Sequence, residues 1–390
     1  MACYISSRNN RYYAAVEDTY GTAAAVTAAQ RFSGLWLDAA QEHERPRRRD
    51  KTGTRTYQGI AGELRKKTRF SLKTYLYNRE SGEAAPRYGA LIQGALGGAP
   101  RAASGGKAIA MSSGATLSFA QAHGLSFGDA VTVGGDLRFV AAVQDAQSVV
   151  LSAPLSAAAQ AGAVTGGTVT YSPAVELKGV SLYDYWSPET AVQRLLRGAA
   201  VDVMEMKVNA DFHEFTFEGQ AADLVDNKSF SSGMGGLAAF PAEPALAPMN
   251  DGPVPGHLGQ AWIGAGPEQM HTLVDARVRI KNNIDFRSRD FGSLAPRCIV
   301  AGDREVTVDL ELYSQDRAMF DELYVAGRQQ SAVPLMIQMG ETQGALCAVY
   351  IPALVPAVPE LLDGEERLRW RLRGSAAIGT EEDEVHVSFG

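Results

Sequence analysis

The chain has 390 residues, of which 45% are apolar and 21% are charged, and its formal net charge is −7. This length predicts two or three domains, and the composition is typical of a globular chain, which excludes disordered and collagen-like classes. No apolar run reaches the roughly 18 to 20 residues that span a bilayer, and the first residues lack the pattern of a signal peptide, so we expect no membrane partner.

The cysteines do not indicate a disulfide framework. Cys3, Cys298 and Cys347 are scattered and show neither CxxC nor Cys/His spacing. We therefore interpret them as reduced structural residues of a protein made in the cytoplasm of a cell.

The first part of the chain predicts strands followed by an exposed arm. An aromatic strand at residues 11–16 leads into a turn, and a second strand is predicted at residues 30–37. Residues 41–56 are highly charged and interrupted by Pro46 and Gly53, which favours an arm that projects from a sheet. A loop facing solvent or another subunit is favoured over direct DNA binding, because no aromatic residues alternate with the charges. The basic residues assigned to the arm are Arg45, Arg47, Arg48, Arg49 and Lys51.

Two stretches share one pattern of a half-buried strand followed by a helix. In residues 304–313, apolar residues alternate with polar ones, and Ser314 can cap a helix over residues 315–328 that ends near Gly327. Residues 69–77 alternate in the same way and lead through a turn to a helix over residues 87–96. The recurrence predicts two copies of one β domain.

A segment of different composition interrupts the first copy. Residues 99–168 are poor in charge and rich in Gly, Ala and Ser, and short strands are predicted at residues 130–133, 137–140 and 148–151. The second copy has no counterpart. We expect a separate β module on the outer side of any assembly.

A closing strand repeats as well and completes the predicted domain plan. Gly219 and Gly374 each follow an aromatic or apolar strand and precede a polar residue and an alanine. The first domain is therefore predicted to consist of residues 1–98 and 169–226, with the module at 99–168. Residues 227–267, rich in Gly, Pro and Ala, are the expected linker, and residues 268–390 form the second domain.

The charges on two strands are exchanged between the copies. In the strand before the helix, Arg69 and Lys73 correspond to Glu305 and Asp309; in the closing strand, Glu214 and Glu218 correspond to Arg369 and Arg373. Opposite charges on neighbouring strands stabilise a sheet, so we expect the two strands to be neighbours within each domain. Two alternatives remain, namely strands at opposite edges that meet across domain junctions, and a chance exchange of surface residues.

No catalytic, cofactor-binding or metal-binding motif is evident. The histidines are dispersed, and His213 and His271 each lack the partners of a catalytic site. For Glu17 and Asp18, a turn-capping role of Asp18 is favoured over a catalytic pair. The sequence thus predicts no enzyme and no cofactor.

The chain resembles the major tail tube proteins of long-tailed bacteriophages. The resemblance rests on the turn at residues 16–22, on Lys281-Asn282-Asn283-Ile284, on Phe291-Gly292-Ser293 before the strand-helix unit, and on the inserted module. It implies a mainly β fold of two tandem tail-tube-type β-sandwich domains, each flanked by a helix, with the small β module inserted in the first.

The resemblance also implies a structural virion protein that polymerises as stacked rings into the tail tube and forms the channel for genome delivery. Closure into a ring would remove exposed sheet edges, and a duplicated chain predicts homotrimeric, pseudo-hexameric rings rather than hexamers. Expected partners are copies of itself, the tape measure, terminator and distal tail proteins, and genomic DNA that passes without specific binding. The expected location is the virion tail, after synthesis in the host cytoplasm.

A carbohydrate-binding or adhesion β-sandwich is the alternative. Its support is the set of four tryptophans, some of which could form a stacking surface for sugars; they are Trp36, Trp186, Trp262 and Trp370.

Overall fold

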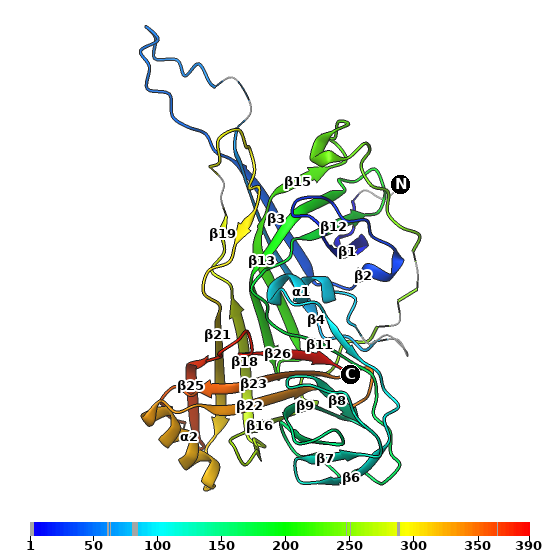
Figure 1. The fold of residues 1–390 in the computed structure, drawn as a ribbon. Coiled ribbons are helices and arrows are strands. Elements are labelled where there is room, and N and C mark those ends of the chain that lie inside the picture. The colour runs from blue at the N-terminus through cyan, green and yellow to red at the C-terminus, as the bar shows by residue number, and fades with distance from the viewer. Residues whose placement is uncertain are drawn as a thin grey trace.

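The computed structural model describes residues 4–60, 62, 64–79, 85–246, 248–249, 251–286, 289–364 and 366–390. Within these residues the protein is mainly β, with two α-helices packed on layers of strands (Figure 1). The predicted fold class is confirmed. Cys3 lies outside the described residues, whereas Cys298 is exposed and Cys347 is buried, both as free thiols.

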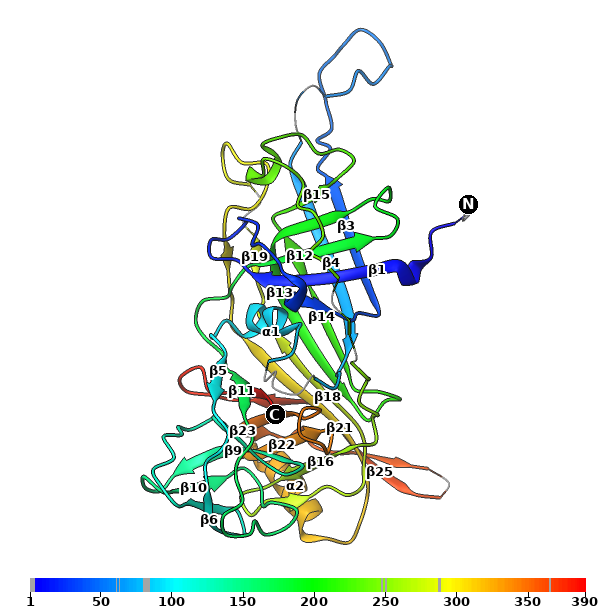
Figure 2. The same cartoon turned by 90° about the vertical axis from the view of Figure 1, so that its right-hand side faces the viewer.

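A long antiparallel sheet runs through both halves of the chain (Figures 1 and 2). Each neighbouring pair of its strands is hydrogen-bonded in antiparallel register. In spatial order the strands are β3 (Trp36–His43), β4 (Lys66–Tyr75), β14 (Glu214–Ala221), β13 (Arg194–Val208), β18 (Leu273–Lys281), β21 (Glu305–Tyr313), β25 (Leu368–Ala377) and β24 (Glu360–Asp363).

One face of this sheet is apolar and the other is charged. On β21, Val306, Val308 and Leu310 are almost completely buried, whereas the alternating residues are only partly covered. The same alternation occurs on β4 and β14, because successive side chains of a strand point to opposite faces. Antiparallel pairing aligns these faces from strand to strand. The solvent-side residues of the long sheet, such as Arg69 on β4 and Asp309 on β21, are called the charged face below.

A second layer of strands covers the apolar face. Strand β13 belongs to both layers, since its first residues pair with β12 and β15 and its later residues pair with β14 and β18. One continuous hydrophobic core lies between the layers. The remaining strands of this layer are β1 (Asn10–Val16), β2 (Arg31–Phe32), β5 (Arg101–Ala103), β11 (Thr168–Tyr171), β12 (Val180–Trp186), β15 (Asp223–Asp226), β16 (Gly259–Ile263), β17 (Glu268–Gln269), β22 (Val333–Met339), β23 (Cys347–Val355) and β26 (His386–Phe389).

The two predicted helices exist, and each packs on the apolar side. Helix α1 (Gly89–Leu96) buries Leu91 and Ile92 in the core, and helix α2 (Ala318–Gln329) places the Phe320 ring 5.1 Å from that of Trp370 on β25. Three short 3-10 helices, Ser7–Asn9, Ala28–Gln30 and Met234–Gly236, lie in connections.

Both helices begin later than predicted. The amide of Ser314 donates to the carbonyl of Leu368 at 2.9 Å and so continues the pairing of β21 with β25. Arg317 is therefore the N-cap of α2, without a side-chain hydrogen bond to the first turn. Gly327 does not end α2. The chain turns into the left-handed region at Gln330, whose φ is 53°.

The inserted module has its own sheet and core. Its strands pair in the order β6-β7-β10-β9-β8, and Leu117, Val140 and Val149 are fully buried among them. Strands β8 and β10 have the predicted bounds. The five strands are β6 (Ile109–Ser113), β7 (Thr116–Phe119), β8 (Ala130–Val133), β9 (Asp136–Val143) and β10 (Ser148–Leu151).

The predicted linker has two parts. Most of residues 227–258 lie outside strands, and Phe240 packs against the aromatic cluster around Tyr13 and Tyr185 of the first half. Glu243 accepts hydrogen bonds from Arg11 and from the hydroxyl of Tyr13. Strand β16, however, lies within the range predicted as linker and pairs with β22 of the second half.

The two halves join edge to edge through β13 and β18. In this junction Met204 lies opposite Ile280 and Met206 lies opposite Val278, and all four side chains are fully buried. The core therefore continues across the boundary between the predicted domains, and the division into two tube domains stays a prediction.

Candidate assembly surfaces

The predicted arm extends from one end of the long sheet (Figures 1 and 2). It differs in extent from the prediction, because β3 continues to His43 and β4 begins only at Lys66, so the arm comprises residues 44–65. Arg48 forms an ion pair with Asp50 inside the arm. The five predicted arm residues, Arg45, Arg47, Arg48, Arg49 and Lys51, are all exposed on it.

The second half has an equivalent arm that the sequence did not indicate. Residues 282–304 connect β18 to β21, as residues 44–65 connect β3 to β4, and they contain the hairpin of β19 (Asp285–Phe286) and β20 (Ile299–Val300). Both arms leave the same end of the sheet (Figure 1). The second arm contacts the first where Arg289 lies 3.8 Å from Glu44, and it contacts the start of β4 where the Lys66 amide donates to the Leu294 carbonyl at 2.9 Å. Phe291 on the second arm is fully exposed, which is unusual for an aromatic side chain.

The long sheet has an open edge at each side. Strand β3 pairs with β4 and β24 pairs with β25, and among the described residues no strand pairs with the outer edge of either. Exposed apolar residues accompany these edges, including Trp36 on β3 and Leu361 on β24, which is 58% exposed. Open edges of this kind are templates for pairing with another chain.

The exchanged charges of the first half lie on neighbouring strands. Strand β4 pairs with β14, and the Nζ atom of Lys73 lies 2.8 Å from a carboxylate oxygen of Glu214. Arg69 lies opposite Gln220, and Glu218 lies opposite Ser71, whose hydroxyl donates to it at 3.4 Å.

In the second half β21 and β25 are neighbours too, but the ion pairs involve other residues. Arg369 contacts Glu311, and Arg371 contacts the same carboxylate, each at 3.0 Å. These two arginines hold the pKa of Glu311 below its usual value. The other charged residues predicted to pair make different contacts. The carboxylate of Asp309 accepts a hydrogen bond from the Gly374 amide at 2.7 Å, and Glu305 lies 4.0 Å from Lys281. Arg373 is exposed, at the point where the register between β21 and β25 shifts.

The turn after β1 is capped by Glu17 rather than by Asp18. The buried carboxylate of Glu17 accepts hydrogen bonds of 2.7 Å from the amides of Gly21 and Gly198 and from the hydroxyl of Ser181. Burial raises the pKa of this carboxyl. Asp18 is exposed. The sequence indicated the turn, but the donors from Gly198 and Ser181 come from distant strands and could not be inferred from it.

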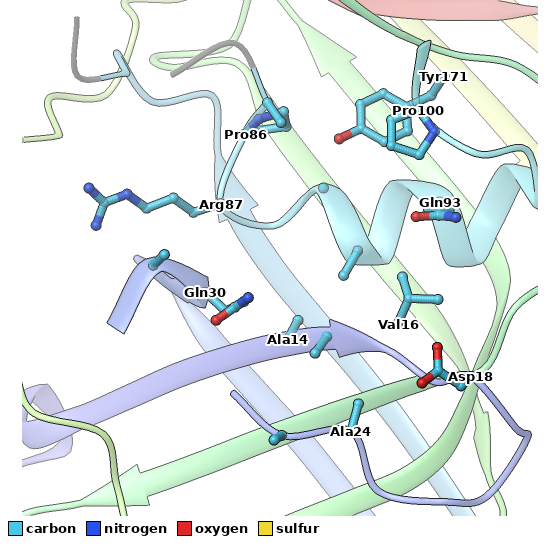
Figure 3. A pocket seen from close by; sticks show the side chains of 16 residues that line it. Ala14, Val16, Asp18, Ala24, Gln30, Pro86, Arg87, Gln93, Pro100 and Tyr171 are labelled. Carbon is cyan, nitrogen blue, oxygen red and sulfur yellow. The ribbon is translucent and has the colours of Figure 1, made fainter. Parts of the chain in front are cut away.

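A hollow of about 700 Å³ lies between β1, the start of α1 and Pro100 (Figure 3). Most of its wall consists of alanine and proline side chains. Its charged residues, Asp18 and Arg87, lie on different sides of it in Figure 3. A catalytic site needs a nucleophile, a base and an orienting group within hydrogen-bonding distance, and the wall does not supply this arrangement.

The remaining candidate residues do not converge. His213 is buried and its Nε2 lies 2.9 Å from the Leu258 carbonyl, while burial lowers its pKa; His271 is exposed. In the part of the chain that the structure describes, no group of acidic, histidine and cysteine residues has the arrangement of a metal site. No helix in the same residues has the length and apolar character needed to cross a membrane.

The four tryptophans lie on four different strands, β3, β12, β16 and β25. Trp262 lies under the guanidinium of Arg138, and Trp370 packs against Phe320 and Tyr324 of α2. Two of the four are thus already covered by neighbours within the chain.

A mainly β chain with open sheet edges and paired arms at one end has the features of a subunit of a larger structure. The model of the phage tail tube protein family matches residues 7–389, nearly the whole chain, and the protein belongs to this family. It is a structural protein of the bacteriophage virion tail. None of the curated proteins compared with the chain matches it.

Proposed function

We propose that three chains close into a ring, that rings stack into the tail tube, and that the tube is the channel for genome delivery. The observation that carries this proposal is the junction of β13 with β18, because it joins two similar half-sheets edge to edge within one chain. If the same type of junction joins one chain to the next, both open edges of the long sheet are used and a closed ring results.

The register of the junction between chains follows from the one within the chain. Strand β24 pairs with the closing strand β25 as the later part of β13 pairs with the closing strand β14. Because Arg369 corresponds to Glu214 when the sequences of the two closing strands are aligned, Leu362 opposite Arg369 takes the place of Lys207 opposite Glu214. The outer edge of β24 is therefore the counterpart of the β13 edge that meets β18.

The partner edge is β3, which precedes the first arm as β18 precedes the second. Trp36 lies opposite Lys73 on β4, and Arg277 lies opposite Asp309 on β21, so these two residues have equivalent places. Within the chain Lys207 lies opposite Arg277. Between chains, Leu362 should therefore lie opposite Trp36 of the next copy, which covers two apolar side chains at once.

Negative-stain microscopy of the purified protein combined with cysteine pairing tests the proposal. Opposite residues in a sheet have Cβ atoms about 4.5–5.5 Å apart, so the double variant Trp36→Cys/Leu362→Cys should form disulfides between chains on mild oxidation. The cysteine variants are made in a chain that also carries Cys3→Ser and Cys298→Ser, so that these native thiols cannot form disulfides. We expect microscopy to show tubes. On a denaturing non-reducing gel we expect disulfide-linked species of increasing size, the largest of which contains three chains.

The control variant is Trp36→Cys/Leu361→Cys, because Leu361 points to the other face of β24 and should not pair. Linked species of up to six chains would refute the trimer, and an absence of tubes would refute the polymerisation itself.

The arms are proposed to reach the adjoining ring. In the assembled virion the tube would meet the tape measure, terminator and distal tail proteins, after synthesis of the chain in the host cytoplasm.

A further inference from the structure

The inserted module belongs to the first half by sequence but packs on the second half. The strands β5 and β11, called the stem below, pair with each other and lie between α1 and β12 along the chain. Figures 1 and 2 show the module beside β16, β22 and β23 of the second half. The module and its stem, together called the insert, therefore lie on the second layer, away from the charged face of the long sheet.

Aromatic rings form the apolar part of this contact. The Phe139 ring of β9 stacks on the ring of Tyr350 on β23, with 5.5 Å between the ring centroids. Phe127 makes edge-to-face contacts with Tyr350 and with His386 of β26. Leu137 is fully buried in the same cluster. The contact thus has a small hydrophobic core of its own, separate from the core inside the module.

Hydrogen bonds fix the direction of the contact. The side-chain carbonyl of Gln338 on β22 accepts from the Leu137 amide at 2.9 Å and from Arg138 at 2.6 Å. The side-chain amide of Gln338 donates to the Gly135 carbonyl at 2.8 Å. Both Gln338 and Arg138 are buried. Since a buried polar group that loses its partner costs free energy, the module has one favourable position on the second half.

The two surfaces approach so closely that glycine is required at two points. A side chain at Gly135, in the turn between β8 and β9, would overlap the carbonyl oxygen of Glu341. A side chain at Gly128 would overlap the ring of His386. At these points the contact has no free space in which the module could tilt.

The stem attaches to the second half at a separate place. Strand β11 pairs with β26, and the Thr170 hydroxyl donates to that of Ser388 at 3.1 Å. Beyond β11, the Ala174 carbonyl accepts from Arg304 at 2.6 Å, and the same arginine lies 2.6 Å from Glu384. The insert is thus attached to the second half both through the module and through the stem.

A single pair of strands would leave the angle between the halves adjustable. The twist between neighbouring strands varies from roughly −10° to −35° among sheets. Closing a ring of six halves needs a turn of about 60° at each junction, so a deviation of about 10° at every junction would add up to a whole half. The junction of β13 with β18 is one such pair of strands. A further attachment away from this pair removes the freedom.

We propose that the insert is a brace that fixes the angle between the two halves and thereby the number of chains that close a ring. This inference rests on the proposed function. The second half has no such insert, since α2 ends at Gln329 and β22 begins at Val333. The junctions within chains are therefore braced, whereas those between chains are not. A chain whose angle is set beforehand also loses less conformational freedom when the ring closes.

The test loosens the brace without changing the junction of β13 with β18. In Gly135→Leu the new side chain must push the module away from Glu341. The backbone of Gly135 lies outside the left-handed region, so the hairpin itself accepts a side chain. Phe127→Ser is a milder variant, because it only removes one ring from the contact. The matched control, Ala146→Leu, adds a similar side chain at an exposed turn of the module.

Spin labels report the angle in the unassembled chain. Asp18→Cys and Asp321→Cys place one label on each half, both at exposed positions, in a chain that carries Cys3→Ser and Cys298→Ser. Cys347 stays, because it is completely buried. Pulsed electron paramagnetic resonance gives the distribution of distances between the labels, and slow hydrogen exchange of module amides shows that a variant keeps the module folded. Negative-stain microscopy of the same variants without labels shows the rings.

We expect one narrow distribution of distances for the wild type and the control, and a distribution broadened about twofold or more for Gly135→Leu, with Phe127→Ser between them. Assembled Gly135→Leu should give open arcs and rings of mixed diameter instead of uniform rings. If Gly135→Leu loses the fold of the module, Phe127→Ser decides.

Equal distributions in all chains whose module stays folded would overturn the brace. Broadened distributions together with uniform rings would overturn its role in ring closure. If the wild type forms no rings, the proposed function and the role in closure fail together, while the label distances still show whether the insert holds the two halves at one angle.

Discussion

Arg138 shows how one residue holds the inserted module on the second half of the chain. Its side chain is completely buried and donates to Gln338 at 2.6 Å and to Gln260 at 2.8 Å, both from the second layer of the body. Within the module it pairs with Asp136 at 2.9 Å. The sequence Leu137-Arg138-Phe139-Val140 predicted the strand, and a strand that is apolar on both sides of a charged residue could have indicated that the charge is buried.

We expect Arg138→Met to lower the free energy of unfolding by about 3 to 5 kcal/mol, because Asp136 would be left buried without its cation. The measurement is urea denaturation of the unassembled chain. As a matched control, Arg101→Met removes a largely exposed partner of Asp129 and should cost at most about 1 kcal/mol. A double variant that also carries Asp136→Asn should recover part of the loss. Equal effects of Arg138→Met and Arg101→Met would contradict this account.

His386 is the second residue at this contact. Its Nδ1 lies 2.8 Å from the Ser172 hydroxyl, and its ring packs against Phe127 and Tyr350. Burial, with a smaller effect of Arg101, lowers the pKa of His386 from 6.5 to about 4, while Asp383 acts in the opposite direction.

Because the folded state binds fewer protons than the unfolded state between these two pKa values, stability should fall as the pH is lowered from 6.5 to 4. The loss from this group is about 3 kcal/mol at most. Unfolding of the wild type and of His386→Phe, measured at both ends of this range, should show a smaller loss for the variant. His271→Phe, at an exposed site, should behave as the wild type does. An unchanged pH dependence in His386→Phe would show that the histidine does not titrate in this way.

At the scale of elements, alternation of apolar and polar residues was the most reliable signal. Strand β21 begins within one residue of the predicted bound, and the strands of the module agree closely. This signal failed where a stretch becomes a strand only because it pairs with a strand that is distant in the sequence. Strand β16 lies in a stretch rich in Gly and Pro, and it forms because its backbone pairs with β22 in antiparallel register. The range 57–77 has strand-like composition, yet β4 begins only at Lys66.

The arms provide a prediction at this scale. Deletion of residues 47–51 removes four basic residues from the first arm, where they are exposed. We expect rings to form as before but tubes to be shorter and more sensitive to salt, because contacts with the adjoining ring are lost. Tube length by negative-stain microscopy over a range of ionic strength is the measurement.

Phe291→Ser provides a companion variant on the second arm, since it removes an exposed aromatic ring without changing charge. It should shorten tubes without increasing their sensitivity to salt. If the deletion leaves both length and salt response unchanged, the first arm does not connect rings.

At the scale of the whole molecule, the sequence predicted two copies of one domain but did not predict how the two halves of the chain meet. The continuity of the core through Met204, Met206 and Val278 depends on pairing between β13 and β18, residues about 70 positions apart along the chain. No local pattern encodes such a register. The exchanged charges were the one signal of long-range pairing, and they pointed to neighbouring strands within each half rather than to the junction between the halves.

This shared core predicts that the two halves unfold together. Val278 is fully buried at the junction, so Val278→Ala should destabilise the chain by about 2 kcal/mol through lost packing. If unfolding is cooperative, the slowest-exchanging amides of both halves should exchange faster by the same factor, about 30-fold. Hydrogen exchange of the unassembled chain, followed by mass spectrometry, measures this. Val149→Ala lies in the separate core of the module and should speed exchange mainly there. Faster exchange confined to residues 268–390 in Val278→Ala would show instead that the halves are independent domains joined only at their edges.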